Sequence, residues 1–498
     1  MRKILSTDQI RELDAYTIQH RPILSIDLME NACRAVHTWM LERYSPETII
    51  GVVCGTGNNG GDGLGVARML IDSGFDVFVW VVRSGGNETS DFKTNLERLN
   101  GKAEVVYVSE AISHNMFDHV DVVIDAIFGS GLSRPVAGSV AELIQAINAA
   151  DVERIAIDLP SGLMADKPSE GVIVKADHTL AFQVPKLVFF FPQYHVYLGS
   201  WHLLDIGLHR DYLKQLQTPY YYFQRKNVHK ILHSRSKFDH KGKYGHALLI
   251  AGGYGKVGAA VLASSAALRA GPGLLTVKVP ACGYDILQIS APEAMVVVDG
   301  DERLISKAPS LEGYSVIGIG PGIGQAAETV QAFREILKQA KVRMVIDADA
   351  LNILATHREL LPLVPPDSVL TPHPKEFERL VGPWKNDFAR LEKQKQLARD
   401  LRSVIVLKGA YTSIALPDGT VIFNSSGNPG MAKGGCGDVL TGILTGLMAQ
   451  SYTTADATKL GVFLHGFAGD LAAYEKGMNS LIASDLVDFL PNAFKQAG

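Results

Sequence analysis

Short apolar runs alternate with helix-like stretches over the first 215 residues of the chain. The first helix is predicted to begin after Ser6, because Ser6 and Gln9 have the spacing of a capping box. A glycine-rich loop at residues 55–63 follows the first predicted strand and leads into a helix predicted over 64–73. Such alternation is typical of a parallel sheet that helices cover on both faces. The predicted strands are residues 48–54, 76–82, 121–127 and 154–157.

A second series of the same kind begins near residue 246. Small residues predominate in a helix predicted over 259–270, and two further helices are predicted over 437–449 and 455–474. A Pro-Asp-Gly turn at 417–419 joins two of the later strands into a predicted hairpin. The predicted strands are residues 247–251, 274–279, 315–319, 343–346, 368–370, 403–407, 413–416 and 421–424.

A polar, aromatic-rich connector at residues 214–227 separates the two series. We therefore predict two α/β domains, residues 1–218 and residues 224–498, of which the first is Rossmann-like and doubly wound.

Composition narrows the class of protein. Hydrophobic residues make up 47% and charged residues 20% of the 498 residues, which excludes a disordered or fibrous chain. The net charge of −4 argues against a nucleic-acid partner, because such binders carry a basic domain or stripe. The four cysteines form no Cys-x-x-Cys pair, and no apolar run is long enough to span a bilayer. We expect a cytoplasmic homo-oligomer with no membrane partner.

The first glycine-rich loop contains a literal Gly-x-Gly-x-x-Gly between a strand and a helix. This context favours phosphate binding at a helix N-terminus. An ordinary dinucleotide site would place an acid at the end of the next strand, but Arg83 stands there. The loop also carries Asn58, Asn59 and Asp62, whose oxygen atoms suit a hard cation. The alternative is a glycine turn that only tightens the junction of strand and helix.

Two more predicted strands end in polar loops. Asp125 lies inside an apolar strand that a glycine-rich loop with Arg134 follows, and Asp158 ends the next strand. Because the carboxyl ends of parallel strands share one crevice, Asn59, Asp125 and Asp158 are expected to converge. An aspartate that caps a helix is the alternative for each. Arg134 would suit a phosphate.

These motifs resemble the NAD(P)H-hydrate epimerase family over most of residues 1–215. The resemblance implies that Asp158 is the catalytic acid and base and that K⁺ binds Asn59, Asp125 and Ser161. It also implies which residues bind the hydrated nicotinamide nucleotide: Asn58, Asn59, Gly60, Gly61, Asp62, Gly129, Ser130, Gly131, Leu132, Ser133, Arg134, Pro135 and Asp158.

The second half has a glycine loop at residues 428–437 that opens a helix with Asp438 in its first turn. Backbone N–H groups there can hold a transferring phosphoryl group, and Asp438 can accept the proton of an attacking hydroxyl. A favourable first-turn charge is the alternative. Asp347 and Asp349 end another strand and suit either magnesium or helix capping. His373, between two prolines, is expected to face the cleft.

These segments, with Gly-Pro-Gly at 320–322 and Lys-Gly-Ala at 408–410, resemble the ADP/ATP-dependent NAD(P)H-hydrate dehydratases over residues 228–498. The resemblance implies a ribokinase-like fold. Lys433 and Cys436 stand where small or hydroxylated residues are expected. The implied hydrate-binding residues are Ala259, Gly322, His373 and Asp438, and the implied nucleotide-binding residues are Lys408, Gly409, Ala410, Tyr411, Thr412 and Gly437.

Together the two resemblances imply a fused repair enzyme for NADHX and NADPHX, the hydrated forms of NADH and NADPH. The first domain would interconvert the R and S epimers, and the second would dehydrate the S epimer with Mg²⁺ and ADP or ATP, with ADP favoured. The alternative is a ribokinase-like small-molecule kinase with a non-catalytic N-terminal module that binds protein or RNA.

Overall fold

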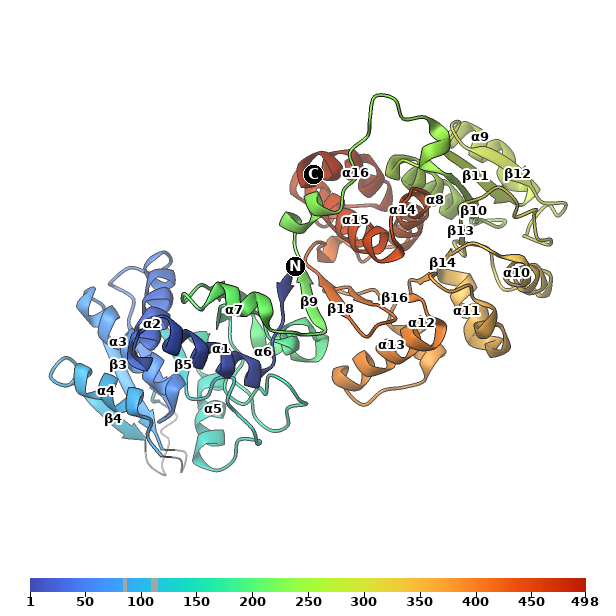
Figure 1. Ribbon diagram of the computed structural model, residues 1–498. Helices are drawn as coiled ribbons and strands as arrows, with labels where there is room; N and C mark the ends of the chain where they lie inside the picture. The colour runs from blue at the N-terminus through green and yellow to red at the C-terminus, as the bar shows by residue number, and fades with distance from the viewer. Residues whose placement is uncertain (84–86, 109–114) are drawn as a thin grey trace. The chain divides into compact units, whose positions relative to one another are not determined.

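Two sheets organise the chain, one in each of two units. The computed structural model describes residues 1–83, 87–108 and 115–498. The units are Lys3–Thr218, and Pro219–Gly498 together with Met1–Arg2 (Figure 1). In these ranges no helix is both long enough and apolar enough to cross a membrane.

The sheet of the N-terminal unit has the strand order β4-β3-β2-β5-β6-β7-β8, and each neighbouring pair runs parallel. The chain adds β3 and β4 on one side of β2 and then β5 to β8 on the other side. The order therefore reverses between β2 and β5, where doubly wound sheets form a crevice at the carboxyl ends of their strands. The strands are β2 (Ile50–Cys54), β3 (Val77–Val82), β4 (Val105–Val108), β5 (Val122–Ala126), β6 (Glu153–Ile157), β7 (His178–Phe182) and β8 (Ser200–Leu204).

Helices cover both faces of this sheet, as the sequence predicted. Val52 of β2 lies in the core formed with α2, α3 and α4, whereas the next residue, Val53, lies in the core formed with α5. The predicted capping box is confirmed, since the Gln9 amide donates to Ser6 Oγ at 3.3 Å and the Ser6 amide to Gln9 Oε1 at 3.1 Å. The helices are α1 (Thr7–His20), α2 (Ser25–Leu41), α3 (Asn58–Asp72), α4 (Ser90–Leu99), α5 (Ser139–Ala149), α6 (His195–Leu198) and α7 (Arg210–Gln215).

The glycine-rich segment is helical where a loop was predicted. Helix α3 begins at Asn58 and not at residue 64, so that prediction is wrong. A Cβ atom on Gly60 would lie 1.8 Å from the Gly55 carbonyl oxygen, and one on Gly63 would lie 2.5 Å from the Cβ of Ala126. The glycines are therefore needed because the first turns of the helix pack directly on the strand ends.

The second sheet has the order β1-β9-β18-β17-β16-β15-β14-β13-β10-β11-β12. The pairs from β12 to β16 run parallel, and β17 and β18 form the predicted antiparallel hairpin. Part of the predicted connector forms β9, which pairs with β18 and buries Phe223. The strands are β1 (Arg2–Lys3), β9 (Tyr220–Phe223), β10 (His246–Ile250), β11 (Leu274–Val279), β12 (Met295–Val298), β13 (Val316–Ile319), β14 (Met344–Ile346), β15 (Val369–Leu370), β16 (Val404–Leu407), β17 (Ser413–Ala415) and β18 (Val421–Asn424).

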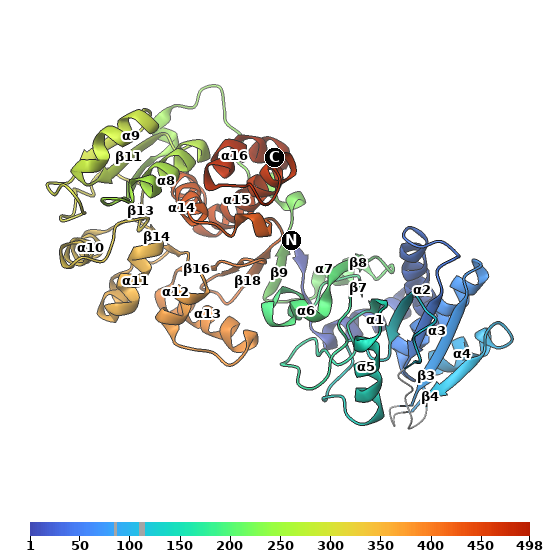
Figure 2. The same ribbon diagram turned by 180° about the vertical axis from the view of Figure 1, so that it is seen from behind.

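Helices α8 and α14 pack closely together on this sheet, with α15 beside α14 (Figure 2). A Cβ atom on Gly442 of α14 would lie 2.1 Å from the carbonyl oxygen of Ala263 in α8, so small residues let the two backbones approach. The helices are α8 (Val257–Ala270), α9 (Tyr284–Ser290), α10 (Ala327–Gln339), α11 (Ala348–Thr356), α12 (Pro374–Val381), α13 (Asp387–Leu401), α14 (Cys436–Ala449), α15 (Thr454–Lys476) and α16 (Ala483–Ala497).

Candidate active sites

Asp158 lies directly after β6, at the crevice of the N-terminal sheet. Its backbone has a φ of +67°, a left-handed conformation that is strained for a residue other than glycine and that is typical of functional positions. Its Oδ2 accepts a hydrogen bond from the Ser130 amide at 2.9 Å, and its Oδ1 pairs with the Lys186 ammonium. The Lys186 side chain is 1% exposed. The sequence analysis did not predict Lys186, which stands between Pro185 and an apolar run.

The Asp158–Lys186 pair sets the charge of this site. Burial by itself would raise the pKa of Asp158, but the Lys186 ammonium and the hydrogen bonds from Ser130 bring that pKa below its usual range. Asp158 is therefore a carboxylate at neutral pH.

A second set of oxygen atoms lies at the ends of β5 and β6. The buried Asp125 carboxylate accepts hydrogen bonds from Ser161 Oγ at 2.6 Å and from the Ser161 amide at 2.7 Å. Burial, partly offset by these bonds, raises the pKa of Asp125 to about 6. Ser161 Oγ accepts in turn from the Phe128 amide at 2.8 Å. Asp125 pairs with no Lys or Arg side chain among the described residues.

The side chains of Asn59 and Asp158 both lie close to Gly129. A Cβ atom on Gly129 would lie 3.2 Å from Asn59 Oδ1 and 3.1 Å from Asp158 Oδ2, so a larger residue would crowd both groups. The Asn59 Nδ2 is buried and has no hydrogen-bond partner in the described parts of the chain. The structure thus brings Asn59, Asp125, Asp158 and Ser161 to one edge. Their amide, carboxylate and hydroxyl oxygens fit a hard cation that would offset the buried charge of Asp125.

The other candidate residues of this domain differ in exposure. Asp62 is buried, and its burial together with the charges of Asp158 and Asp14 raises its pKa well above the usual range. Asn58 opens α3 and is exposed, whereas Gly60 and Gly61 are buried. In the loop after β5, two residues are half-buried, Ser130 and Leu132, and four are exposed, Gly131, Ser133, Arg134 and Pro135.

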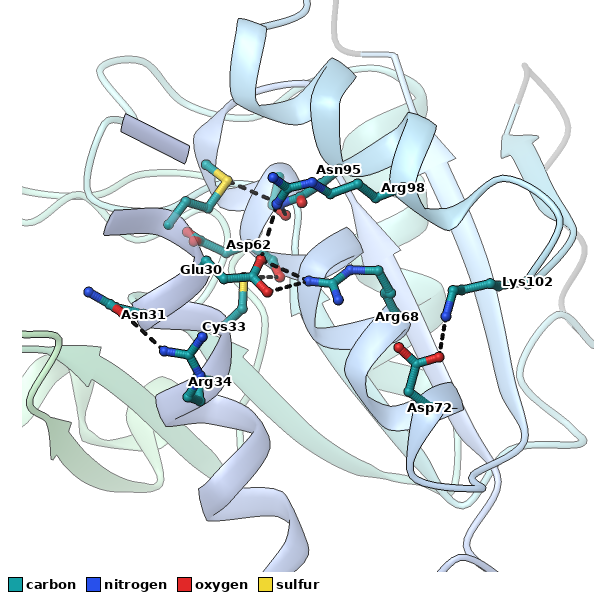
Figure 3. Close-up of polar contacts among 12 residues, drawn as sticks. Glu30, Asn31, Cys33, Arg34, Asp62, Arg68, Asp72, Asn95, Arg98 and Lys102 are labelled. Carbon is teal, nitrogen blue, oxygen red and sulfur yellow. Dashed lines mark hydrogen bonds and ion pairs between the residues drawn. The ribbon is translucent and has the colours of Figure 1, made fainter. Parts of the chain in front are cut away.

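A network of polar contacts between α2, α3 and α4 holds the first turns of α3 in place (Figure 3). Arg68 donates to both carboxylate oxygens of Glu30 at 2.6 and 2.8 Å, and Arg98 donates to the same carboxylate at 3.3 Å. Asn95 Nδ2 donates to the Gly61 carbonyl at 2.9 Å. Since these residues belong to α2, α3 and α4, the network fixes the turn that carries Asn59.

In the second unit, Asp438 lies in the first turn of α14, at the carboxyl edge of the sheet. Asp438 lines a cavity of about 550 Å³. Of the predicted hydrate-binding residues, Ala259 and Gly322 also line this cavity. Further lining residues bring charge to it, namely Lys256, Asp349 and Glu376.

Asp347, at the end of β14, contacts both Lys408 and α14. Its Oδ1 accepts from Lys408 Nζ at 2.9 Å and its Oδ2 from Thr441 Oγ1 at 2.7 Å. Although Asp347 occupies the N-cap position of α11, its side chain makes no capping hydrogen bond, so the interpretation of Asp347 as a helix cap is wrong. Asp349 Oδ2 accepts from the Gly324 amide at 2.8 Å. Asp349 thus lines the cavity, and Asp347 precedes the lining residue Ala348.

The environment of Asp438 is suited to proton transfer. Burial, and then the Asp347 carboxylate, raise its pKa to about 7, against the opposing effect of Lys408. The neighbouring Cys436 side chain is buried, and its carbonyl accepts a hydrogen bond from His465 Nε2 at 2.8 Å. Cys436 thus presents only backbone at the start of the helix. Lys433 donates to the Asn479 carbonyl at 2.7 Å.

The remaining candidates lie around Lys408 and Glu376. A Cβ atom on Gly437 would lie 3.5 Å from Lys408 Nζ, so the end of β16 meets the start of α14. His373 is the N-cap of α12, where its Nδ1 accepts from the Glu376 amide at 3.4 Å, and its side chain is 44% exposed. Past Lys408, two residues are exposed, Gly409 and Ala410, and two are half-buried, Tyr411 and Thr412.

Comparison with known proteins extends over both units. Residues 25–188 match the family described as the YjeF-related protein N-terminus, and residues 247–492 match the family described as NAD(P)H-hydrate dehydratase. A bifunctional NAD(P)H-hydrate repair enzyme of Moorella thermoacetica is 38% identical, over 98% of this chain and 96% of that protein. Enzymes with the same description from Thermofilum pendens and Escherichia coli are 33% and 34% identical, covering 99% and 88% of this chain and 96% and 84% of theirs.

Solved structures resemble the second unit. An ADP/ATP-dependent NAD(P)H-hydrate dehydratase of Bacillus subtilis, co-crystallised with ATP and Mg²⁺, is 35% identical with a TM-score of 0.50, covering 56% of this chain and 99% of that chain. A ribokinase-like protein of Enterococcus faecalis is 29% identical with a TM-score of 0.51, covering 57% of this chain and 98% of that chain. These likenesses confirm the predicted ribokinase-like fold. Because relatives match both halves in the same order over nearly the whole length, the chain belongs to the family of bifunctional NAD(P)H-hydrate repair enzymes.

Proposed function

We propose that the second unit dehydrates S-NADHX and S-NADPHX in the cavity beside Asp438, with ADP or ATP as the phosphoryl donor. The observation that carries this proposal is a half-buried carboxylate at the N-terminus of α14, next to Lys408 and beside a cavity of about 550 Å³. Such a carboxylate can act as a base while the backbone N–H groups of the helix start hold phosphoryl oxygens. Lys408 to Thr412 and Gly437 would contact the nucleotide.

In this reaction Asp438 takes the proton of the C6 hydroxyl, whose oxygen then attacks the terminal phosphorus of the nucleotide. The bond from that phosphorus to its bridging oxygen breaks, and the nucleotide leaves one phosphate shorter, as AMP from ADP or as ADP from ATP. The C6–O bond of the phosphate ester breaks as the lone pair of the ring nitrogen forms a C=N bond. Loss of a proton from C5 then restores the double bond, so that the reduced nicotinamide and inorganic phosphate are the products. Asp347 and Asp349 offer oxygen ligands that would hold magnesium, which would neutralise phosphate charge when bound with the nucleotide.

For the first unit we propose epimerisation of R- and S-NADHX and NADPHX at C6. Support comes from the side chains of Asn59 and Asp158, which both lie close to Gly129, in the crevice of a doubly wound sheet. Asp158 would exchange protons with the substrate, and the loop 129–135 and residues 58–62 would bind it. Asn59, Asp125 and Ser161 would hold a potassium ion, which supplies positive charge next to the buried Asp125. Water adds to either face of the ring, so both epimers of the hydrate form. An epimerase allows a dehydratase that accepts only the S epimer to clear both of them.

We also propose that the protein is a cytoplasmic homo-oligomer. The edge strand β12 exposes Met295, Val297 and Val298, which are apolar side chains that a second copy would cover. Cys33, Cys54 and Cys436 are buried free thiols, which suit a reducing compartment.

The proposed function is tested by incubating the protein with NADHX, Mg²⁺, K⁺ and either ADP or ATP. Return of the reduced-nicotinamide absorbance with release of inorganic phosphate is expected. A ribokinase-like kinase would instead accumulate a stable phosphate ester without recovery of absorbance. Failure with both nucleotides would refute the proposal.

Dehydration is expected to depend on pH through Asp438. A base must be ionised, and the pKa of Asp438 is raised to about 7, so kcat/KM for S-NADHX should fall about tenfold from its plateau by pH 6. The measurement is kcat/KM between pH 5.5 and 8.5 at saturating nucleotide. A flat profile across this range would contradict the assignment of Asp438 as the base.

The two units are expected to work separately, because each has its own sheet and core. Residues 1–218 should epimerise and residues 219–498 should dehydrate when expressed alone. A fragment that begins at residue 224 should be less stable than 219–498, because it lacks β9 and the buried Phe223. Activity assays and thermal unfolding of the three fragments check this, and equal stability of the two C-terminal fragments would show that β9 is dispensable.

A further inference from the structure

One face of helix α1 covers the loop that follows β5. Thr7 Oγ1 donates to the Ser130 carbonyl at 3.3 Å, and a Cβ atom on Gly131 would lie 3.4 Å from the Arg11 guanidinium. Residues 7, 11 and 14 are spaced by four and three, so Thr7, Arg11 and Asp14 share one face of the helix. The face that contacts the loop therefore also carries Asp14, a residue that neither the motifs nor the resemblance pointed to.

Asp14 places an unpaired acid in this site. Its Oδ1 is buried, and no group in the described ranges donates a hydrogen bond to it. An unsatisfied buried carboxyl costs free energy and is rare in cores, whereas active sites leave such groups for a ligand. Asp158 and Lys186 are near enough for their charges to act on Asp14, and the charge of Asp14 acts on Asp62 of α3.

We infer that Asp14 is a second catalytic residue of the epimerase, which exchanges a proton with the oxygen at C6 while Asp158 serves the other half of the reaction. This inference rests on the proposed epimerase function. The geometry that supports it is the position of a free carboxyl, on the helix face over the substrate loop, beside the Asp158–Lys186 pair.

The step balances without any further reagent. The Asp14 carboxyl gives its proton to the C6 hydroxyl, the C6–O bond breaks, and water leaves as the ring nitrogen forms a C=N bond. A water molecule then adds to the opposite face of C6, and the Asp158 carboxylate takes its proton. The product is the other epimer, and the proton then returns from Asp158 to Asp14 through water, which restores the starting state of the enzyme. The reverse reaction uses the same two groups in exchanged roles.

The charges around the two acids favour Asp14 as the proton donor and Asp158 as the proton acceptor. Burial, and then the Asp158 carboxylate, raise the pKa of Asp14 to about 7, against the opposing effect of Lys186, while the pKa of Asp158 is lowered. One carboxyl is thus protonated and the other ionised just below neutrality, as a two-group proton exchange requires. Because the raised pKa belongs to a proton donor, epimerisation should lose rate as the pH rises through about 7.

The test follows conversion of purified R-NADHX to the S epimer by chiral chromatography, with the full chain and potassium but without nucleotide, so that dehydration does not occur. Asp14→Asn should slow conversion at least ~10²-fold at pH 6.5. Asp8→Asn is the matched control, since it makes the same change on the same helix at a side chain that is 91% exposed, and it should leave the rate unchanged. Asp14→Glu retains an acid and should keep a measurable rate that declines at high pH.

Two further measurements separate a catalytic role from a structural one. Tryptophan fluorescence reports folding of the first unit, which holds Trp39, Trp80 and Trp201. Dehydration of S-NADHX by Asp14→Asn should equal that of the wild type. A wild-type rate in Asp14→Asn would overturn the inference. If that variant fails to fold, a pH profile of the wild-type enzyme without a decline above pH 7 would overturn it instead. Absence of epimerisation in the wild type would instead refute the proposed function.

Discussion

Asp438→Asn is expected to slow dehydration of the S epimer by ~10²–10⁴-fold, because the amide cannot accept the proton of the C6 hydroxyl. Asparagine has the size of aspartate, so the cavity and the N-terminus of α14 should keep their shape. Epimerisation in the first unit should proceed at the wild-type rate. Absorbance recovery with purified S-NADHX measures dehydration, and chromatography of the epimers measures the other activity.

A matched control distinguishes the base from a charge that only favours the start of a helix. Asp285 is an exposed acid in the first turn of α9, and Asp285→Asn should cost at most about 1 kcal/mol of stability with no loss of activity. If Asp438→Asn behaved like this control, the role of Asp438 would be that of a helix-start charge, and the proposed mechanism would be wrong.

Asp158→Asn is expected to leave R-NADHX behind when a mixture of epimers is treated with nucleotide, magnesium and potassium. The S epimer should disappear at the wild-type rate, because the second unit is unchanged. The R epimer should then decline only as fast as it epimerises without the enzyme. Replacing potassium by a bulky organic cation should also leave R-NADHX behind with the wild-type enzyme, since small oxygen ligands cannot hold such an ion. Clearance of R-NADHX by the variant at the wild-type rate would remove Asp158 from the mechanism.

Stability must be measured alongside this variant. Asp158→Asn leaves the buried Lys186 without its counter-charge, which typically costs about 3–5 kcal/mol. Combining Asp158→Asn with Lys186→Met removes both charges and should recover most of that loss in urea unfolding, without recovery of epimerisation. Recovered epimerisation in the double variant would show that the pair serves the fold alone.

The amino-acid sequence determined most of the fold, because local spacing carries the information. Alternating apolar runs located β2, β3, β5 and β6 to within two residues, and the Ser6–Gln9 spacing located the start of α1. Close packing decided the start of α3, since the glycines after residue 57 serve contact with Gly55 and Ala126 and not the flexibility of a loop. That contact depends on β5, which is distant in the sequence.

The same division holds for the candidate sites. Asn59, Asp125 and Asp158 stood out because they follow strands, and strand ends converge in a doubly wound sheet. Lys186 and Asp14 carry no such signal, because an isolated Lys or Asp in the sequence is most often exposed. Their burial and the resulting charges arise when α1, the end of β6 and the segment at Lys186 pack together. Desolvation depends on every neighbouring element, so only the tertiary structure decided which of these acids is ionised.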